Sequence, residues 1–189
     1  MLFRSAALLT VFLTFSAEAV FAQAVPRTVS GKPDLQGIWQ VQNRASYNLL
    51  SHTARQDMQP GMGVVVGDEI PYQPWAAEQQ LANFENRQTD DPLSKCFLPG
   101  VPRIMYMEHP FHIFQTDERV AITFEWTQVF RHIYTGGQQQ MYPGIEMWMG
   151  DSRGRWEGDV LVVEVIDHND QTWFDAAGNF HSNAMHLTE

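Results

Sequence analysis

The stretch Trp148–Asp167, WMGDSRGRWEGDVLVVEVID, decides the fold class of this chain. It predicts a β-hairpin, with a short strand around Gly154–Trp156, a tight turn at Glu157–Asp159 and an apolar strand at Val160–Ile166. Gly158 supplies the positive φ that such a turn needs, and the valines that follow have β-branched side chains that pack well in a strand. The hairpin therefore indicates a β-rich fold, although it names no reaction.

More strands are expected on both sides of this hairpin. Phe111–Gln115 and Arg119–Thr127 have the pattern of strands joined by a short turn, Val129–Tyr134 continues the series, and a last strand is expected near Ala184–Thr188. Four apolar residues alternate along the second of these strands and should share one face: Val120, Ile122, Phe124 and Trp126. The prediction is a mostly β fold, an antiparallel meander that forms a lipocalin-like barrel or half-barrel.

The N-terminal half is expected to add one strand, one long loop and one helix. Asp34–Val41 should be a strand with Trp39 packed inward. Ala45–Gly67 has little pattern apart from a strand-like Val64–Val66, and long loops in compact domains are either functional or poorly ordered. The helix is predicted at Pro74–Asn86, where apolar residues recur at helical spacing: Ala77, Leu81 and Phe84.

The first residues have the features of a secretory signal peptide. Arg4 precedes an apolar run, and small residues before position 23 offer cleavage sites. The run is about ten residues long, whereas a membrane-spanning helix needs ~20. We therefore expect a signal peptide at 1–22, a strand, long loop and helix at 23–103, and the β meander at 104–189, the last two forming one domain. The expected location is periplasmic or secreted, with no membrane span in the mature chain.

Composition narrows the possible partners. The formal net charge is −10, which argues against nucleic acid, because nucleic-acid-binding proteins carry basic patches. Hydrophobic residues make up 44% of the chain and aromatic residues 12%, as in a domain with a packed core. Cys96 is the only cysteine, so no intrachain disulfide can form. Apolar Phe97 and Leu98 follow it, which favours a buried structural thiol.

Four groups of motifs carry a resemblance to other proteins. They are PDL and GIW within Pro33–Trp39, DP and CFLPGVPR within Asp91–Arg103, PF and IFQT within Pro110–Thr116, and GDSRGRWEGDVLVVEV with GNFHSNAMH within Gly150–His186. As a set they resemble a large family of exported bacterial proteins of unknown function. Members of that family continue beyond the position of Glu189, so the resemblance implies that this chain is truncated at its C-terminus. It implies no activity for any residue.

Histidines raise the question of a metal site. Six of the seven lie at His109 or later, and His168-Asn169-Asp170 has the His-x-Asp spacing of a facial iron triad. The next histidines, at 181 and 186, follow too closely for the barrel that usually carries such a triad. We therefore predict no metal and no cofactor.

Four residues are candidates for ligand binding. Arg153 and Arg155 should share a sheet face with Asp151, and such a row presents guanidinium to an anionic ligand or forms a salt-bridge ladder. Trp173 and Asp175 combine an aromatic wall with a polar group, as in a pocket for an apolar or sugar-like ligand. Alternatively, Asp175 caps a turn and Trp173 belongs to the core.

Asp170, His181 and His186 are the candidate catalytic residues, since a carboxylate beside an imidazole can perform general acid–base chemistry. Nucleophile elbows, phosphate loops and dinucleotide fingerprints are missing from the sequence. Three functions stay open. The leading one is an exported protein that binds a small apolar or amphipathic ligand on the concave face of the β scaffold. The alternatives are a cofactor-free lyase, isomerase or hydrolase, and a structural or interaction domain.

Overall fold

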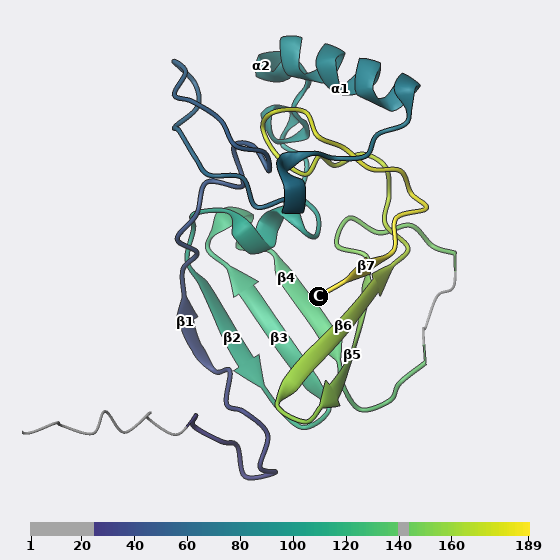
Figure 1. Cartoon of the computed structure of the whole chain (residues 1–189). Coiled ribbons are helices and arrows are strands. Elements are labelled where there is room, and N and C mark those ends of the chain that lie inside the picture. The colour runs from purple at the N-terminus through teal and green to yellow at the C-terminus, as the bar shows by residue number, and fades with distance from the viewer. Residues whose placement is uncertain (1–24, 140–143) are drawn as a thin grey trace, which may run out of the picture.

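The computed structural model describes residues 25–139 and 144–189, so the predicted signal peptide at 1–22 lies outside it. Seven strands form one mixed sheet in sequence order (Figure 1). They are β1 (Gly37–Trp39), β2 (Phe111–Gln115), β3 (Arg119–Phe124), β4 (Phe130–Tyr134), β5 (Asp151–Glu157), β6 (Val160–Ile166) and β7 (Leu187–Thr188). Helices α1 (Pro74–Glu85) and α2 (Arg87–Asp90) lie above the sheet in Figure 1. Short 3₁₀ turns cover Val66–Asp68, Pro92–Lys95, Arg103–Tyr106 and Trp126–Gln128.

The predicted hairpin is confirmed as β5 and β6. Its antiparallel register runs from Asp151↔Ile166 to Glu157↔Val160, so the first strand starts earlier than expected. Gly158 has φ +62° in the turn, and a Cβ there would meet no atom within 4 Å. Glycine is therefore favoured at this position by the backbone conformation of the turn and not by a lack of space.

The sheet departs from an antiparallel meander at one place. β4 and β5 pair in parallel through Ile133↔Ser152 and Tyr134↔Arg153, whereas the other neighbouring strands are antiparallel. The long connection between these two strands carries the chain back to the end where β4 begins. In the described residues the strand order runs from β1 to β7 without pairing these two, so the sheet is not closed into a barrel. The mostly β prediction holds at this coarser level.

The core lies on one face of this sheet. Alternate residues of β3 are buried there, together with residues of β4 and β6: Val120, Ile122, Phe124, Ile133, Val163 and Val165. Val101 and Ile104, which flank the start of the 3₁₀ turn at 103–106, pack onto them. The alternation predicted for Val120–Phe124 is confirmed, while Trp126 falls beyond the strand in a 3₁₀ turn. Core side chains thus occupy this face of the sheet.

Three local expectations are wrong. Trp39 is 49% exposed, because β1 is short and the indole Nε1 donates back to the Leu35 carbonyl at 3.0 Å. Cys96 is exposed, since it ends a 3₁₀ turn in a left-handed conformation with φ +61°. The valines at 64–66 form no strand; the last of them begins a 3₁₀ turn.

Helix α1 forms as predicted but docks through other side chains. Leu81 is 61% exposed, while Ala76 is buried. Gln80 Nε2 donates to the Ala177 carbonyl at 2.8 Å, and Asn83 Nδ2 donates to the Gly178 carbonyl at 3.1 Å. Residues 167–186, yellow-green to yellow in Figure 1, run between α1 and the sheet. Polar contacts with this segment therefore fix the helix in place.

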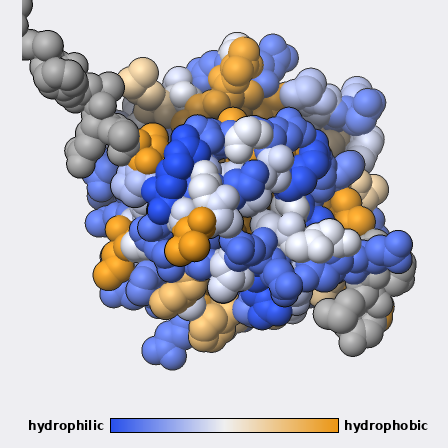
Figure 2. Space-filling view, turned by 90° about the horizontal axis from the view of Figure 1, so that it is seen from below, coloured by the Kyte–Doolittle hydropathy of each residue, from blue (hydrophilic) through white to orange (hydrophobic). Residues whose placement is uncertain are grey.

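Figure 2 shows the lower end of the molecule in Figure 1, where the turn between β5 and β6 lies. Hydrophilic residues predominate on it, and hydrophobic residues appear as separate spots. Within residues 25–139 and 144–189, no helix has the length and apolar character needed to cross a membrane.

Candidate functional site

The candidate site lies beside the middle of the long loop. Two isolated bridges, His52↔Gly61 and Arg55↔Met58, fold residues 52–61 into a narrow hairpin that we call the tongue. The backbone N–H of His52 donates to the Gly61 carbonyl at 3.0 Å, and the N–H of Gly61 donates to the His52 carbonyl at the same distance. Gly61 is required, because a Cβ there would lie 2.7 Å from Cε1 of His52. The tongue thus gives a loop of weak sequence pattern a defined conformation.

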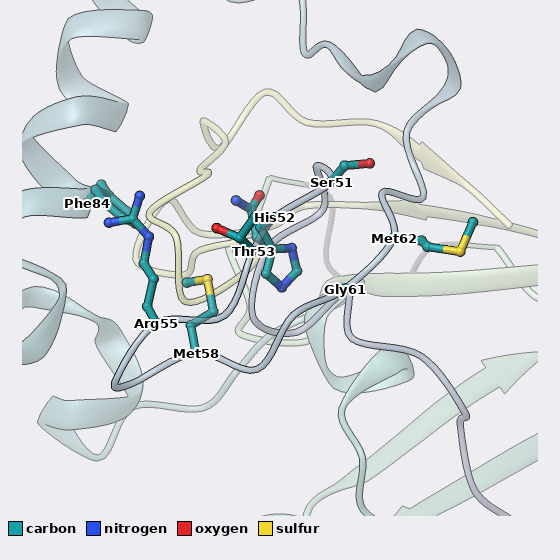
Figure 3. Close-up of a pocket in the computed structure, with 9 residues that line it drawn as sticks. Ser51, His52, Thr53, Arg55, Met58, Gly61, Met62 and Phe84 are labelled. Atoms are coloured by element: carbon teal, nitrogen blue, oxygen red, sulfur yellow. The ribbon is translucent and has the colours of Figure 1, made fainter.

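An open cavity of about 520 Å³ lies between the tongue and α1 (Figure 3). Most of its lining comes from the tongue and its flanks, and one residue comes from the helix: Asn48, Ser51, His52, Thr53, Arg55, Met58, Gly61, Met62 and Phe84. Pockets for small molecules have volumes of roughly 300–1,000 Å³ and combine apolar walls with a few polar groups. The cavity has both the size and the mixed lining that an amphipathic molecule needs.

Arg55 brings a guanidinium to this cavity. Its Cζ lies 5.0 Å from the centroid of the Phe84 ring, and Figure 3 shows the two groups side by side. Arg87 lies 4.2 Å from the same ring and is paired with Asp57 at 2.8 Å. Among the described residues, Arg55 by contrast has no carboxylate partner. A guanidinium held on an aromatic ring and not neutralised by a carboxylate can receive an anionic group of a ligand.

Two further polar side chains of the cavity, His52 and Ser51, also make hydrogen bonds with backbone atoms of the loop. His52 Nδ1 donates to the Leu50 carbonyl at 2.8 Å, which leaves Nε2 as an acceptor in the neutral ring. The Ser51 hydroxyl accepts from Gly63 N at 2.9 Å and keeps its own hydrogen to donate. Met58 is 4% exposed and Met62 87% exposed, so one thioether forms part of the wall while the other lies at the surface.

The predicted arginine row makes ion pairs within the sheet. Arg153 donates to Asp151 at 2.8 Å, and its guanidinium also lies 4.6 Å from the Tyr134 ring. Arg155 pairs with Glu157 at 2.8 Å and with Glu164 at 3.4 Å. These contacts are those of the salt-bridge ladder that the sequence left open as an alternative.

Asp175 and Trp173 do not share one pocket. Asp175 is completely buried and accepts four hydrogen bonds, among them one from Leu49 N at 2.8 Å and one from Asn179 Nδ2 at 2.7 Å. Burial raises the pKa of its carboxyl to about 6, against the effect of these hydrogen bonds. Trp173 is half-buried and lines a separate hollow together with Asp170 and Phe97. The contacts of Asp175 match the turn-capping alternative.

The three candidate catalytic residues are not joined by hydrogen bonds in the described structure. Asp170 is exposed, and His186 pairs with Glu164 at 2.8 Å on the outer side of the sheet. His181 is buried; its Nδ1 donates to the Ser182 carbonyl at 3.0 Å, so its Nε2 accepts from the Thr172 hydroxyl at 2.7 Å.

Burial lowers the pKa of His181, and the charge of Asp170 raises it to a smaller extent. A hydroxyl beside an imidazole can act as a nucleophile and base. Thr172 is only 2% exposed, however, so a substrate could reach this pair only if the loop opened.

His168, the first residue of the His-x-Asp spacing, is a buried histidine. It is 1% exposed, its ring lies 5.9 Å from that of His181, and in the described structure its Nε2 has no hydrogen-bond partner. Burial, with a smaller contribution from His181, lowers the pKa of His168 from 6.5 to about 4. The folded chain therefore keeps this ring neutral where an unfolded chain protonates it.

Replacing His168 with phenylalanine is expected to change how stability depends on pH. The histidine takes up a proton near pH 6.5 in the unfolded chain and only near about 4 in the folded chain. Its contribution to the free energy of unfolding is therefore lost as the pH falls from about 6.5 to about 4. Wild type should lose about 3 kcal/mol relative to the variant between about pH 7 and about pH 4. Urea unfolding of both proteins measures this difference, and the titration of Asp175 cancels in the comparison. Parallel stability curves would contradict the prediction.

No group of three histidine, cysteine, aspartate or glutamate side chains could hold a metal ion within the part of the chain that the structure describes. The cavity residues were missed from the sequence because no motif marks them. The available signal was the long loop at 45–67 itself, with its methionines and its weak pattern. Comparisons of the chain with family models, with curated proteins and with solved structures find no match.

Proposed function

We propose that this chain is an exported binding protein whose loop cavity takes a small amphipathic molecule with an acidic group. The observation that carries the proposal is Arg55, whose guanidinium lies on Phe84 beside a cavity of about 520 Å³ without a carboxylate partner in the described residues. What distinguishes Arg55 from the other arginines stacked on rings is that it lines this cavity. It favours an anionic group at that end of the ligand.

The rest of the cavity supports an apolar body for this ligand. Met58 and Phe84 supply wall surface, and the flexible thioether of Met62 can adapt to different shapes. The proposal places the ligand in the loop above the sheet, whereas the sequence predicted it on the concave sheet face. The half-barrel description and the export of the chain remain parts of the proposal, the latter resting on the signal-peptide pattern at 1–22.

Octanoate is a suitable probe, because it joins a carboxylate to an alkyl chain. We expect saturable binding by isothermal titration calorimetry, weakened at least about tenfold by Arg55→Gln, since a hydrogen bond to a charged group contributes about 1.5–3 kcal/mol. Phe84→Leu should also weaken binding, because it removes the ring that orients the guanidinium.

Arg119→Gln is the matched control. Arg119 on β3 lies 5.3 Å from the ring of Tyr134 on β4, so the same charge is removed from a similar stacked arrangement outside the cavity. Octanoate binding should not change in this variant. Equal binding of octyltrimethylammonium, or an equal effect of both arginine variants, would contradict an anion-selective site at Arg55.

A further inference from the structure

Another hollow, of about 290 Å³, lies beside three of the 3₁₀ turns. Asp91 and Leu93 line it from the segment after α2, and Arg103 lines it from the 3₁₀ turn that packs onto the core. His109, just before β2, and Trp126, just after β3, line it as well. None of its lining residues lines the cavity at Arg55. Its contacts are thus independent of the proposed function.

Two of the residues that line this hollow each carry a buried hydrogen-bond donor with no partner among the described residues. Arg103 is 3% exposed, and its Nη1 and Nη2 donate to the two carboxylate oxygens of Asp91 at 2.8 and 2.7 Å. A guanidinium has five N–H groups, and the Nε–H of Arg103 is left buried and unpaired. The indole Nε1–H of Trp126 is buried and unpaired as well. Buried donors in native structures are nearly always satisfied, so two unpaired donors on residues that line one hollow call for an acceptor.

The charges of the hollow indicate what kind of acceptor fits. Asp91 neutralises Arg103 through the bidentate pair, and Glu108, also in the lining, is paired with Arg44. No uncompensated cation therefore remains to attract an anion. The ring of Trp126 lies 4.7 Å from that of His109 at an angle of 32°, which gives the hollow an aromatic wall. Such a wall suits a flat group.

We propose that this hollow binds an uncharged planar carboxamide, whose carbonyl oxygen accepts from the donors that Arg103 and Trp126 leave unpaired. The amide N–H groups of such a ligand match the carboxylate of Glu108, an acceptor in the same lining. The ligand class thus differs from the amphipathic acid proposed for the cavity at Arg55.

The test uses the ¹⁵N-labelled chain and benzamide, with benzoate as a charged molecule of the same shape. Arg Nε–H and Trp Nε1–H give separate NMR signals, and Trp126→Phe assigns the indole. We expect benzamide to shift both signals saturably, and Trp126→Phe to weaken its binding by about tenfold, the value of one neutral hydrogen bond. Octanoate binding should be unchanged in this variant, which keeps an aromatic ring at the position.

Three outcomes would overturn the proposal. One is the absence of a saturable shift of either signal, and another is benzoate binding as tightly as benzamide. The third is a high-resolution crystal structure with benzamide present in which ordered water alone satisfies both donors. Urea unfolding of Trp126→Phe confirms that the variant is folded. Failure of benzamide with normal octanoate binding rejects only this site, and the reverse result rejects only the proposed function.

Discussion

Replacing Asp175 with alanine is expected to lower the free energy of unfolding by about 3–5 kcal/mol. Its carboxylate is completely buried and accepts from Leu49 N at 2.8 Å, Ala177 N at 3.0 Å, Asn179 N at 3.1 Å and Asn179 Nδ2 at 2.7 Å. Alanine leaves these donors without an acceptor, and each buried donor left unpaired costs about 1–3 kcal/mol. Urea unfolding measures the loss.

Asp159→Ala is the control for this experiment. Asp159 pairs with Arg27 at 2.7 Å, but both side chains are about half exposed, and such surface pairs contribute little to stability. Asp175→Asn should fall between the two variants, because an amide oxygen can still accept part of the network. A loss below about 1 kcal/mol for Asp175→Ala would contradict the structural role of this carboxylate.

The same carboxylate connects the segment under α1 to the cavity. Through Leu49 N it holds the chain two residues before Ser51, which lines the cavity at Arg55. The turn that it caps receives Gln80 and Asn83 from α1. Asp175 was a ligand-binding candidate in the sequence, and its contacts make it a positioning residue instead. Asp175→Ala should therefore weaken octanoate binding without removing a contact to the ligand.

The strands could be predicted wherever one face is buried, because burial imposes a period of two on the sequence. Val120, Ile122 and Phe124 show this, and so does the hairpin around Gly158. The parallel pairing of β4 with β5 could not be predicted in this way. Local patterns are alike for the two strand directions, and the direction depends on where the connection after Tyr134 returns the chain.

The candidate site was harder to predict because its parts are distant in sequence. Arg55 meets Phe84 only after the tongue and α1 are in place, and no spacing rule connects the two residues. Sequence spacing instead indicated Arg153 and Arg155, whose charges are paired with carboxylates within the sheet. For Asp175, residue type and turn context had already offered the capping role as an alternative.

Replacing Asp91 with alanine is expected to be as damaging as the loss of Asp175, at about 3–5 kcal/mol. Asp91 forms the bidentate pair with Arg103, whose side chain is 4% exposed. Without the carboxylate, Arg103 keeps a buried and uncompensated charge. The backbone N–H of Leu93 also loses its acceptor, which lies at 2.9 Å in the native chain. Urea unfolding measures the loss, and neighbouring Asp90 provides a control: its pair with Lys95 is about half exposed at 3.4 Å, so Asp90→Ala should cost less than about 1 kcal/mol.

A double variant separates the cost of the uncompensated Arg103 charge from the cost of the lost hydrogen bond from Leu93 N. Arg103→Met removes the buried cation while keeping an unbranched side chain of comparable reach, so Asp91→Ala combined with Arg103→Met should be more stable than Asp91→Ala alone. The difference reports the cost of leaving Arg103 uncompensated, and the remaining deficit against wild type includes the lost hydrogen bond from Leu93. If the double variant is no more stable than the single one, Arg103 has found water or another acceptor. The burial that the structure assigns to this ion pair would then not hold.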